Sequence, residues 1–277
     1  MRDNPNTFLF SVDLEDVRMM VPDGHKYAER VPETTYRYLN FLQKHSAKAT
    51  FFVVGDLARK YPELIKEIER SGHEIACHSD KHIPLTELTR DQFSRDLENN
   101  LEAIHKTGVS DVYGYRAPTF SINHKVMFVY DIMSEFGINY SSSVLPAKNP
   151  LHGWKEFGRQ PKKVGNVIEI PITTSKLSLL DVPYAGGVYF RVLPFFLIKW
   201  LCKRERGPIN SYCHPYDVDD QQEKFMHPAI NNNTFYNELL FFNRKNTIKR
   251  FDRLIDTLDL KIQTYHSYSK RLKSDGI

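Results

Sequence analysis

The sequence predicts a single α/β domain built around a parallel sheet or barrel. Segments of strand-like composition alternate with segments of helical periodicity along most of the chain, which is the rhythm of βαβ units. The chain has 277 residues, of which 41% are hydrophobic, and this is enough to bury one large core. We find no internal repeat, low-complexity tract or convincing linker, so we expect residues 1–277 to form one domain.

The alternation is clearest in the N-terminal part of the chain. Residues 7–12 are rich in β-branched and aromatic side chains, which suits a buried strand that ends where acidic residues begin. Residues 32–44 then carry apolar side chains at helical spacing, with Glu33 near the start. The same reasoning predicts a strand at 49–54, a helix at 62–71 and a strand at 74–77.

Later segments continue the pattern less regularly. We expect helices at 90–106 and 124–136, separated by a strand at 112–115. Between Ser141 and Tyr184, several prolines and glycines predict long loops and short strands. Towards the C-terminus, the pattern predicts a helix at 194–203, a strand at 208–212, a helix at 246–257 and a strand at 260–264.

Composition argues against several classes of partner. The formal charge of +4 is the small difference between 38 basic and 34 acidic residues spread along the chain, so we expect no nucleic-acid partner. The most apolar later segment, 189–202, is interrupted by Arg191, Pro194 and Lys199, and is too short and too broken to span a bilayer. We expect its apolar side to be core, with peripheral contact to a membrane surface as the alternative.

Cysteine content and the N-terminus bear on the compartment. The three cysteines, Cys77, Cys202 and Cys213, lack C-x-x-C spacing, and their odd number leaves one outside any disulfide scheme. The N-terminal residues are polar and lead into a short apolar run that soon meets acidic residues, so no secretory signal can be identified. We therefore expect a cytoplasmic protein, and its oligomeric state is left open.

An acidic cluster follows the first predicted strand. Asp13, Glu15 and Asp16 lie so close together that their carboxylates repel one another unless a cation or a proton lies among them. On its own the cluster also fits a solvated acidic turn. In α/β barrels, however, the loops after the strands hold the active site, and other polar clusters of this sequence also follow predicted strands.

Two histidines, His78 and His82, follow the predicted strand at 74–77. On one helical turn their spacing places both rings on the same face, where their nitrogens can converge on a metal ion. A histidine pair alone also occurs by chance on surface helices. Two histidines together with one carboxylate leave coordination positions free for water, as a hydrolytic site requires.

Two further polar residues stand at strand ends. Arg116 precedes Ala117 and Pro118, and alone it would be interpreted as an arginine paired with a surface carboxylate. His214 follows the predicted strand at 208–212 and opens the run His-Pro-Tyr-Asp-Val-Asp. This histidine could be a general acid, or a packed ring bonded to a backbone carbonyl.

Together these segments resemble the polysaccharide deacetylase family, which is NodB-like and is also called carbohydrate esterase family 4. The likeness extends from about Phe8 to Thr264, nearly the whole chain. It is carried by residues 10–16, Ala-Thr-Phe-Phe-Val-Val-Gly at 49–55, Gly-His-Glu-Ile-Ala-Cys-His-Ser-Asp-Lys-His at 72–82, Arg-Ala-Pro at 116–118, and His214. Gly-Gly-Val-Tyr-Phe-Arg at 186–191 and His-Pro-Tyr-Asp at 214–217 look closest to the branch associated with bacterial exopolysaccharide gene clusters. The resemblance implies one catalytic domain, a distorted (β/α) barrel of NodB type with about seven parallel strands.

The resemblance also implies a metal-dependent hydrolase that removes an N-acyl group, acetyl or formyl, from an amino sugar. The sugar would belong to a polysaccharide, a lipid-linked precursor or a nucleotide-linked precursor. His78 and His82 would hold a divalent metal ion, commonly zinc, together with one acid of the first cluster. Asp13 would be the general base, Arg116 would orient it, and His214 would protonate the leaving amine. The residues expected to bind the carbohydrate are Pro118, Gly187, Tyr189 and Arg191.

The sequence departs from the family pattern at two places. Many members have adjacent aspartates, whereas here Leu14 and Glu15 separate Asp13 from Asp16. Alternation along a strand favours Glu15 as the third metal ligand, while a turn after Leu14 would favour Asp16. We rank Asp16 ahead because its side chain has the shorter reach, and keep Glu15 as the alternative. The family's usual aspartate and tryptophan that support the acid histidine are not evident; the candidate replacements are Asp181, Asp217 and Asp219.

Two other functions fit part of the sequence. A hydrolase of small non-sugar amides, of the ureide type, would keep the fold, since Tyr184, Tyr189 and Phe190 could stack on a sugar or on a heterocycle. A non-catalytic carbohydrate-binding barrel is the other alternative. The presence of every candidate catalytic and ligand residue argues against it.

Overall fold

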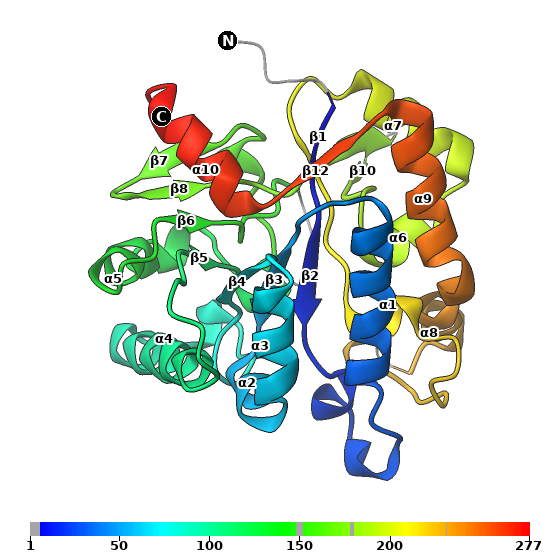
Figure 1. Ribbon diagram of the computed structural model, residues 1–277, viewed down its shortest axis with the longest axis horizontal. Helices are drawn as coiled ribbons and strands as arrows, with labels where there is room; N and C mark the ends of the chain where they lie inside the picture. Colours follow the sequence, from blue (N-terminus) through cyan, green and yellow to red (C-terminus); the bar gives the residue numbers. More distant parts are fainter. Residues whose placement is uncertain (1–5, 148–151, 178–179, 231) are drawn as a thin grey trace.

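The computed structural model describes residues 6–147, 152–177, 180–230 and 232–277. Helices surround a central set of strands (Figure 1). The α/β class predicted from the sequence is confirmed, because most neighbouring strands run parallel and helices connect them. Among the described residues, no helix combines the length and the apolar character needed to cross a bilayer.

The main sheet contains seven strands in the order β2-β3-β4-β5-β6-β8-β7. All neighbours from β2 to β8 are parallel, and β7 pairs with β8 in the antiparallel direction. The bounds are β2 Ser11–Leu14, β3 Thr50–Val53, β4 Glu74–Cys77, β5 Gly114–Tyr115, β6 Tyr140–Ser141, β7 Lys162–Val164 and β8 Val167–Glu169.

A smaller parallel sheet continues the main one through the N-terminal strand. Its central strand β1 lies between β11 and β12, and β1 leads along the chain into β2. An isolated parallel bridge between Val12 and Cys213 joins the two sheets. The bounds are β1 Thr7–Leu9, β11 Ile209–Asn210 and β12 Lys261–Gln263, and an antiparallel hairpin is formed by β9 Ser175–Leu177 and β10 Leu180–Val182.

Side-chain contacts complete the ring of strands on the other side of β11. Asn210 donates from Nδ2 to the Pro171 carbonyl at 2.6 Å and from its backbone N–H to Thr173 Oγ1 at 2.8 Å. These bonds connect β11 with the segment that follows β8. The ring is therefore a distorted barrel, as the sequence led us to expect.

The helices confirm most of the predicted positions. The amphipathic segments predicted at 32–44, 62–71, 90–106, 194–203 and 246–257 all form helices. The bounds are α1 Val31–Lys44, α2 Gly55–Lys60, α3 Pro62–Arg70, α4 Arg90–His105, α5 Val129–Glu135, α6 Gly187–Val192, α7 Phe195–Arg204, α8 Thr234–Phe241, α9 Thr247–Leu258 and α10 Tyr265–Ser274.

Two differences from the predicted elements have local causes. The helix predicted at 124–136 begins as a separate 3-10 turn at His124–Val126, and the α-helical part is only α5. Helix α6 was not predicted because its first residue, Gly187, follows another glycine and indicates a loop. Gly187 has a φ of 52°, and an added Cβ would lie 2.9 Å from the ring of Tyr212, so glycine is required by this close approach.

Aromatic packing in the core fixes the position of α6. The ring of Phe190 stacks on Phe251 of α9 with centroids 3.9 Å apart, and Phe251 meets Phe10 edge-on at 5.1 Å. All three side chains are buried, and each such ring pair contributes about 0.5–1.5 kcal/mol beyond the area it buries. The residue after Phe190 is Arg191, which is thereby held against the barrel.

The carboxyl ends of the parallel strands carry the polar residues of interest. Glu15 follows β2, His78 follows β4, Arg116 follows β5, and His214 comes directly after the residue bridged to β2. Because parallel strands end at the same edge of a sheet, these side chains are brought to one end of the barrel.

Candidate metal centre and active site

Glu15, His78 and His82 form a compact group of possible metal ligands. The Oε2 atom of Glu15 lies 2.6 Å from Nε2 of His82 and 3.5 Å from Nε2 of His78. One ligand atom from each residue lies within 4.8 Å of those of the other two. Two imidazoles and one carboxylate are the donor types that hold a hydrolytic zinc ion, so the group fits a divalent cation.

The two histidines converge from a loop rather than from a helix, which corrects the helical arrangement expected from their spacing. After β4 the chain turns through two left-handed residues, Ser79 with φ 67° and His82 with φ 56°. The loop is held by α4: the carboxylate of Asp96 accepts from the Asp80 N–H at 3.1 Å, and Asn100 Oδ1 accepts from the His78 N–H at 3.2 Å. The rings of His78 and His82 then lie 5.0 Å apart at 74°.

A backbone contact sets the tautomer of His78. Its Nδ1 lies 2.8 Å from the carbonyl oxygen of Arg116. Because a carbonyl oxygen can only accept, Nδ1 carries a proton, and Nε2 is the ring nitrogen that faces Glu15. A metal-ligating histidine usually has an outer hydrogen bond of this kind on the ring nitrogen that does not face the ion, so the contact orients Nε2 for a ligand role.

Asp16, which the sequence analysis ranked ahead of Glu15 as the third ligand, lies outside this group. Arg18 binds its carboxylate, with Nη2 2.6 Å from Oδ2 and Nε 3.0 Å from the same oxygen. Asp16 also caps the short helix Val17–Met20 by accepting from the Arg18 N–H. The strand alternation continues past β2 and turns Glu15 inward, so Glu15 replaces Asp16 as the candidate ligand.

Burial and charge act in opposite directions on the Glu15 carboxyl. Burial raises its pKa, but His82, His214 and a hydrogen bond from His78 together hold the pKa well below its usual range. Burial lowers the pKa of His82, and the adjacent Glu15 charge more than offsets this effect and raises it. The carboxyl of Glu15 is therefore ionised and available as a ligand.

Asp13 is held by the fully buried guanidinium of Arg116. Arg116 Nη1 donates to Asp13 Oδ1 at 2.5 Å and to Ser11 Oγ at 2.6 Å. Its Nη2 donates to Tyr265 Oη at 3.0 Å, and the ring of Phe52 lies 4.0 Å from the guanidinium carbon. Burial lowers the pKa of Arg116, but the Asp13 charge outweighs it and raises the pKa, so the guanidinium stays charged. The expected contact between Arg116 and Asp13 is present.

His214 has its supporting acid three residues along the chain. Asp217 Oδ2 lies 2.8 Å from His214 Nδ1, and Oδ1 of the same carboxylate accepts from Arg191 Nε at 3.0 Å. Of the three candidates left open, Asp217 is therefore the one beside His214, whereas Asp219 pairs with Arg30. His214 Nε2 lies 3.8 Å from Glu15 Oε1, which directs it towards the possible metal group.

The acid partner changes the protonation of His214. Burial alone lowers the pKa of this imidazole, but the charge of Glu15 and the Asp217 hydrogen bond raise it to about 9. Burial raises the pKa of Asp217, and the charge of Arg191 with the His214 bond lowers it to about 2. The pair is therefore an imidazolium beside a carboxylate at neutral pH.

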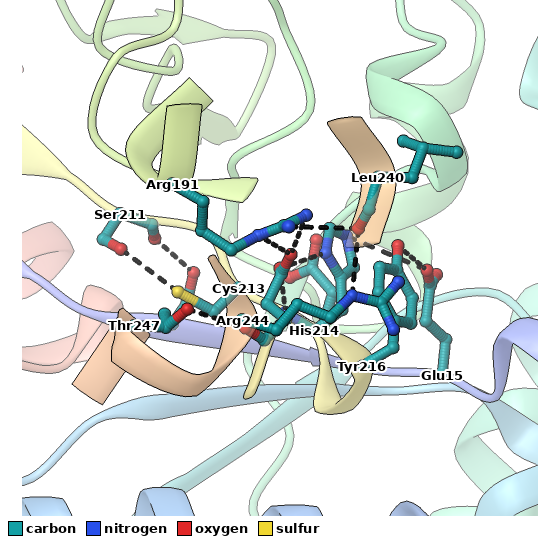
Figure 2. Close-up of polar contacts among 12 residues, drawn as sticks. Glu15, Arg191, Ser211, Cys213, His214, Tyr216, Leu240, Arg244 and Thr247 are labelled. Atoms are coloured by element: carbon teal, nitrogen blue, oxygen red, sulfur yellow. Dashed lines mark hydrogen bonds and ion pairs between the residues drawn. The ribbon is translucent and has the colours of Figure 1, made fainter. Parts of the chain in front are cut away.

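Tyr216 is a site residue that the sequence analysis missed. Its hydroxyl donates to Glu15 Oε1 at 3.0 Å, and its ring stacks on His214 with centroids 4.6 Å apart at 6° (Figure 2). Burial and the Glu15 charge raise its pKa well above the usual value, so the hydroxyl stays a donor. The only signal in the sequence was an aromatic residue two positions after His214, which alone does not indicate this contact.

The four residues predicted to bind carbohydrate are placed differently from one another. Arg191 is corrected: it is buried, and its nitrogens bind Asp217 and the Leu240 and Phe242 carbonyls, so it does not face substrate. Gly187 donates its N–H to the Tyr212 carbonyl at 2.8 Å and serves backbone packing. Pro118 is buried at the start of a 3-10 turn, and Tyr189 is 38% exposed; their role in binding stays a prediction.

A hollow of about 660 Å³ lies apart from this site, between α1 and α3. Its lining includes Lys48, Glu67 and His73 and none of the groups described above. Its volume therefore says nothing about the chemistry at the strand ends.

Two family models match the chain. The model described as "Polysaccharide deacetylase" matches residues 15–141, and the model described as "Domain of unknown function (DUF3473)" matches residues 142–267. The boundary crosses one sheet, because β6 pairs in parallel with β8. The first region contributes the possible metal ligands and Arg116, and the second contributes His214 with its partners.

The sequence is also similar to characterised proteins over part of its length. The peptidoglycan-N-acetylmuramic acid deacetylase of Bacillus subtilis is 39% identical over 85 residues, which are 30% of this chain and 32% of that protein. The chain thus spans about a third of the length of this curated relative.

Solved structures resemble the chain over nearly its full length. A structure from Mycobacterium smegmatis, described as a polysaccharide deacetylase, has a TM-score of 0.63 at 18% identity and covers 96% of this chain and 91% of its own. A Bacillus anthracis protein described as a family 4 carbohydrate esterase pseudoenzyme has a TM-score of 0.55 at 15% identity. The match covers 97% of this chain and 67% of that chain. These likenesses confirm the predicted NodB-type barrel.

We predict that Glu15, and not Asp16, is needed for metal binding. Glu15→Gln removes the charged ligand atom. The zinc affinity of this variant should therefore fall by more than the roughly 10–100-fold that is typical when a residue supporting a ligand is changed. Asp16→Asn keeps the three-donor group and should bind zinc as the unchanged protein does. Equilibrium dialysis against zinc measures both. Loss of zinc from Asp16→Asn with retention by Glu15→Gln would reverse the assignment.

Tyr216→Phe should weaken zinc binding while leaving the fold intact. The substitution keeps the ring stacked on His214 and removes only the hydrogen bond to Glu15, so affinity should fall by about 10–100-fold. Competition with a chelating dye measures the change, and Tyr236→Phe, at an exposed tyrosine, is the matched control. Equal affinity in the two variants would show that Tyr216 does not support the ligand.

Proposed function

We propose, from the match of residues 15–141 to the polysaccharide deacetylase model, that this protein is a metal-dependent hydrolase of N-acylated amino sugars. One observation carries the proposal: the Glu15-His78-His82 group is flanked by the Asp13–Arg116 pair and by the His214–Asp217 pair. Such a site contains a place for a cation, a candidate base and a candidate acid.

The donor set indicates what a cation would contribute. A divalent ion bound by Glu15, His78 and His82 would polarise the acyl carbonyl and lower the pKa of a coordinated water. Zinc is the ion that two histidines and one carboxylate suit best, and we propose it here. Tyr216 and the Arg116 carbonyl hold two of the three ligands in orientation.

Asp13 is the proposed general base. Arg116 occupies its Oδ1 and holds the carboxylate in place, and the carboxylate would take the proton of the attacking water. Arg116 is itself fixed by Ser11, Ser142 and Tyr265, which leaves it little freedom to move. A base held in this way requires little reorganisation during the reaction.

His214 is the proposed general acid. Asp217 holds the imidazolium at Nδ1, and Nε2–H points towards Glu15, where the amide nitrogen of a substrate would lie. When the C–N bond breaks, the nitrogen takes the proton from Nε2 and leaves as an amine, while the acyl group leaves as its acid. Without that proton the nitrogen is a very poor leaving group.

The proposal specifies the acyl group and the sugar by chemical class. The Bacillus subtilis relative is described as a peptidoglycan-N-acetylmuramic acid deacetylase, which supports an N-acetyl group on an amino sugar of a polysaccharide. The N-formyl group and the lipid-linked or nucleotide-linked precursors expected from the sequence stay predictions. The cytoplasmic location expected from the sequence stays a prediction; Cys77, Cys202 and Cys213 are free and buried.

The zinc-loaded protein should release acetate and free amine in equal amounts from N-acetylated amino-sugar oligomers. Chitooligosaccharides and peptidoglycan fragments are suitable substrates, with acetate and primary amine measured in the same sample. Asp13→Asn should lower the rate by about 10²–10⁴-fold, the usual contribution of a general base, while zinc stays bound. Asp23→Asn, an exposed acid near the site segment, is the matched control.

Two outcomes of this assay would contradict the proposal. If the folded, zinc-loaded protein cleaves a ureide and no amino sugar, it is an amidase of small non-sugar substrates. If it cleaves neither but retains carbohydrate in a binding assay, it is a non-catalytic barrel.

Asp217→Asn should move the alkaline limit of activity to lower pH. The native pKa of His214 is raised to about 9, so the imidazolium is present below that pH and lost above it. A cation at Glu15 would offset the Glu15 charge, which leaves Asp217 as the main support of the proton. Removing its charge should lower the His214 pKa, and we expect the alkaline limb of kcat/KM to shift down by about one pH unit. The exposed Asp220→Asn is the control, and an unshifted limb in Asp217→Asn would exclude this role.

A further inference from the structure

Helix α7 presents an unusual outer face. Its buried side consists of Ile198, Leu201 and Cys202. On the opposite side Phe196 is 71% exposed and Trp200 is 48% exposed. These two rings are four residues apart and therefore lie one above the other on the same side of the helix.

Cations share this face with the two rings. Lys199 and Lys203 occupy positions three and seven residues after Phe196, so all four side chains follow one helical stripe. The guanidinium of Arg204 lies 4.6 Å from the centroid of Trp200. Residues 186–204 contain no aspartate or glutamate. The outer face of α7 is therefore aromatic and positively charged.

The neighbouring helix α9 extends the positive charge. Arg253 is exposed and lies 4.5 Å from the ring of Phe195, the first residue of α7. Lys249 of α9 is also exposed. The acid Asp252 between them on α9 is bound by Lys44 at 2.9 Å and by His45 at 2.7 Å, on the side facing α1.

Helix α8 also has a pair of exposed aromatic side chains, but it lacks the positive charge of α7. On α8, Phe235 is 67% exposed and Tyr236 is 57% exposed. The single charged residue of that helix is Glu238, which pairs with Lys224 at 2.6 Å. The two helices match in aromatic exposure and differ in charge.

We propose that the outer face of α7 docks on an anionic lipid surface. Aromatic rings and long basic side chains on one side of a helix suit the headgroup layer: the rings enter it, and the cations meet lipid phosphates. The lysine stems lie along the apolar boundary while their ammonium groups stay at the polar level. The segment that the sequence analysis expected to be core is thus core on one side and a lipid contact on the other.

Docking in this way leaves the candidate active site uncovered. Figure 1 shows α7 beside α9 at the end of the molecule where β1 begins, whereas Glu15 follows the opposite end of β2. The site would face away from the lipid surface. The proposal is therefore independent of the proposed function, and hydrolysis of a small soluble substrate should not depend on it.

Fluorescence of Trp200 tests the proposal. The chain has two tryptophans, Trp154 and Trp200, so Trp154→Phe leaves one reporter on the docking face. With vesicles of phosphatidylglycerol and phosphatidylcholine, the Trp200 emission should shift to the blue; with phosphatidylcholine alone it should not. Raising salt to 1 M shortens the screening length to about 3 Å and should remove most of the shift.

Sedimentation with the same vesicles compares matched variants of the full chain. Phe196→Ser should weaken binding by roughly tenfold, and exchanging Lys199 and Lys203 for Glu should abolish it. Phe235→Ser, which removes a similarly exposed ring from the helix without basic residues, should bind as the unchanged protein does. All these variants should keep the activity of the unchanged protein on soluble substrate, which also shows that they are folded.

Several results would overturn the proposal. The first is that the protein binds neutral vesicles as tightly as anionic ones. The second is that Phe196→Ser and Phe235→Ser lose vesicle binding to the same extent. The third is that the protein binds neither vesicle type. A blue shift of Trp200 that appears with protein concentration and without lipid would assign the face to contact between copies of the chain instead.

Discussion

The arrangement depends on one buried carboxylate. Glu15 is shielded from water, and burying a charge of this kind is costly unless partners surround it. Its two oxygens are shared among His78, His82, Tyr216 and, at longer range, His214. Three parts of the fold contribute to this group: the end of β2 supplies the acid, the loop after β4 supplies the histidines, and the segment after β11 supplies the tyrosine. A cation between Glu15 and the two imidazoles would relieve the same constraint, which is why the group fits a metal ion.

Much of this arrangement could be predicted from the sequence, because it depends on periodicity and on strand order. The parallel alternation placed Asp13, His78, Arg116 and His214 at strand ends, where they meet. The structure favours Glu15, whereas the sequence analysis ranked Asp16 ahead, because it gave side-chain reach more weight than strand alternation and did not consider Arg18 as a partner for Asp16. The histidine spacing indicated convergence correctly, but the convergence arises from two left-handed residues that no periodicity reveals.

The remaining contacts could not be predicted, because they join distant parts of the chain. Arg191 reaches Asp217 only because Phe190 stacks on Phe251 and fixes α6. Tyr265, from the last helix, reaches Arg116 beneath the site. The two regions recognised by separate family models thus meet in one sheet and one site. The region matched by the polysaccharide deacetylase model holds the possible metal ligands, while the following region supplies His214 and the groups that support it.

The most direct test of this account is the position of a zinc ion in a crystal of the protein grown with zinc, located by anomalous scattering at the zinc absorption edge. The account predicts one strong peak bonded to Glu15 Oε2, His78 Nε2 and His82 Nε2 at about 2.0–2.2 Å. A crystal that takes up no zinc at this group, or a peak on Asp16 with the two imidazoles turned away from it, would contradict the account.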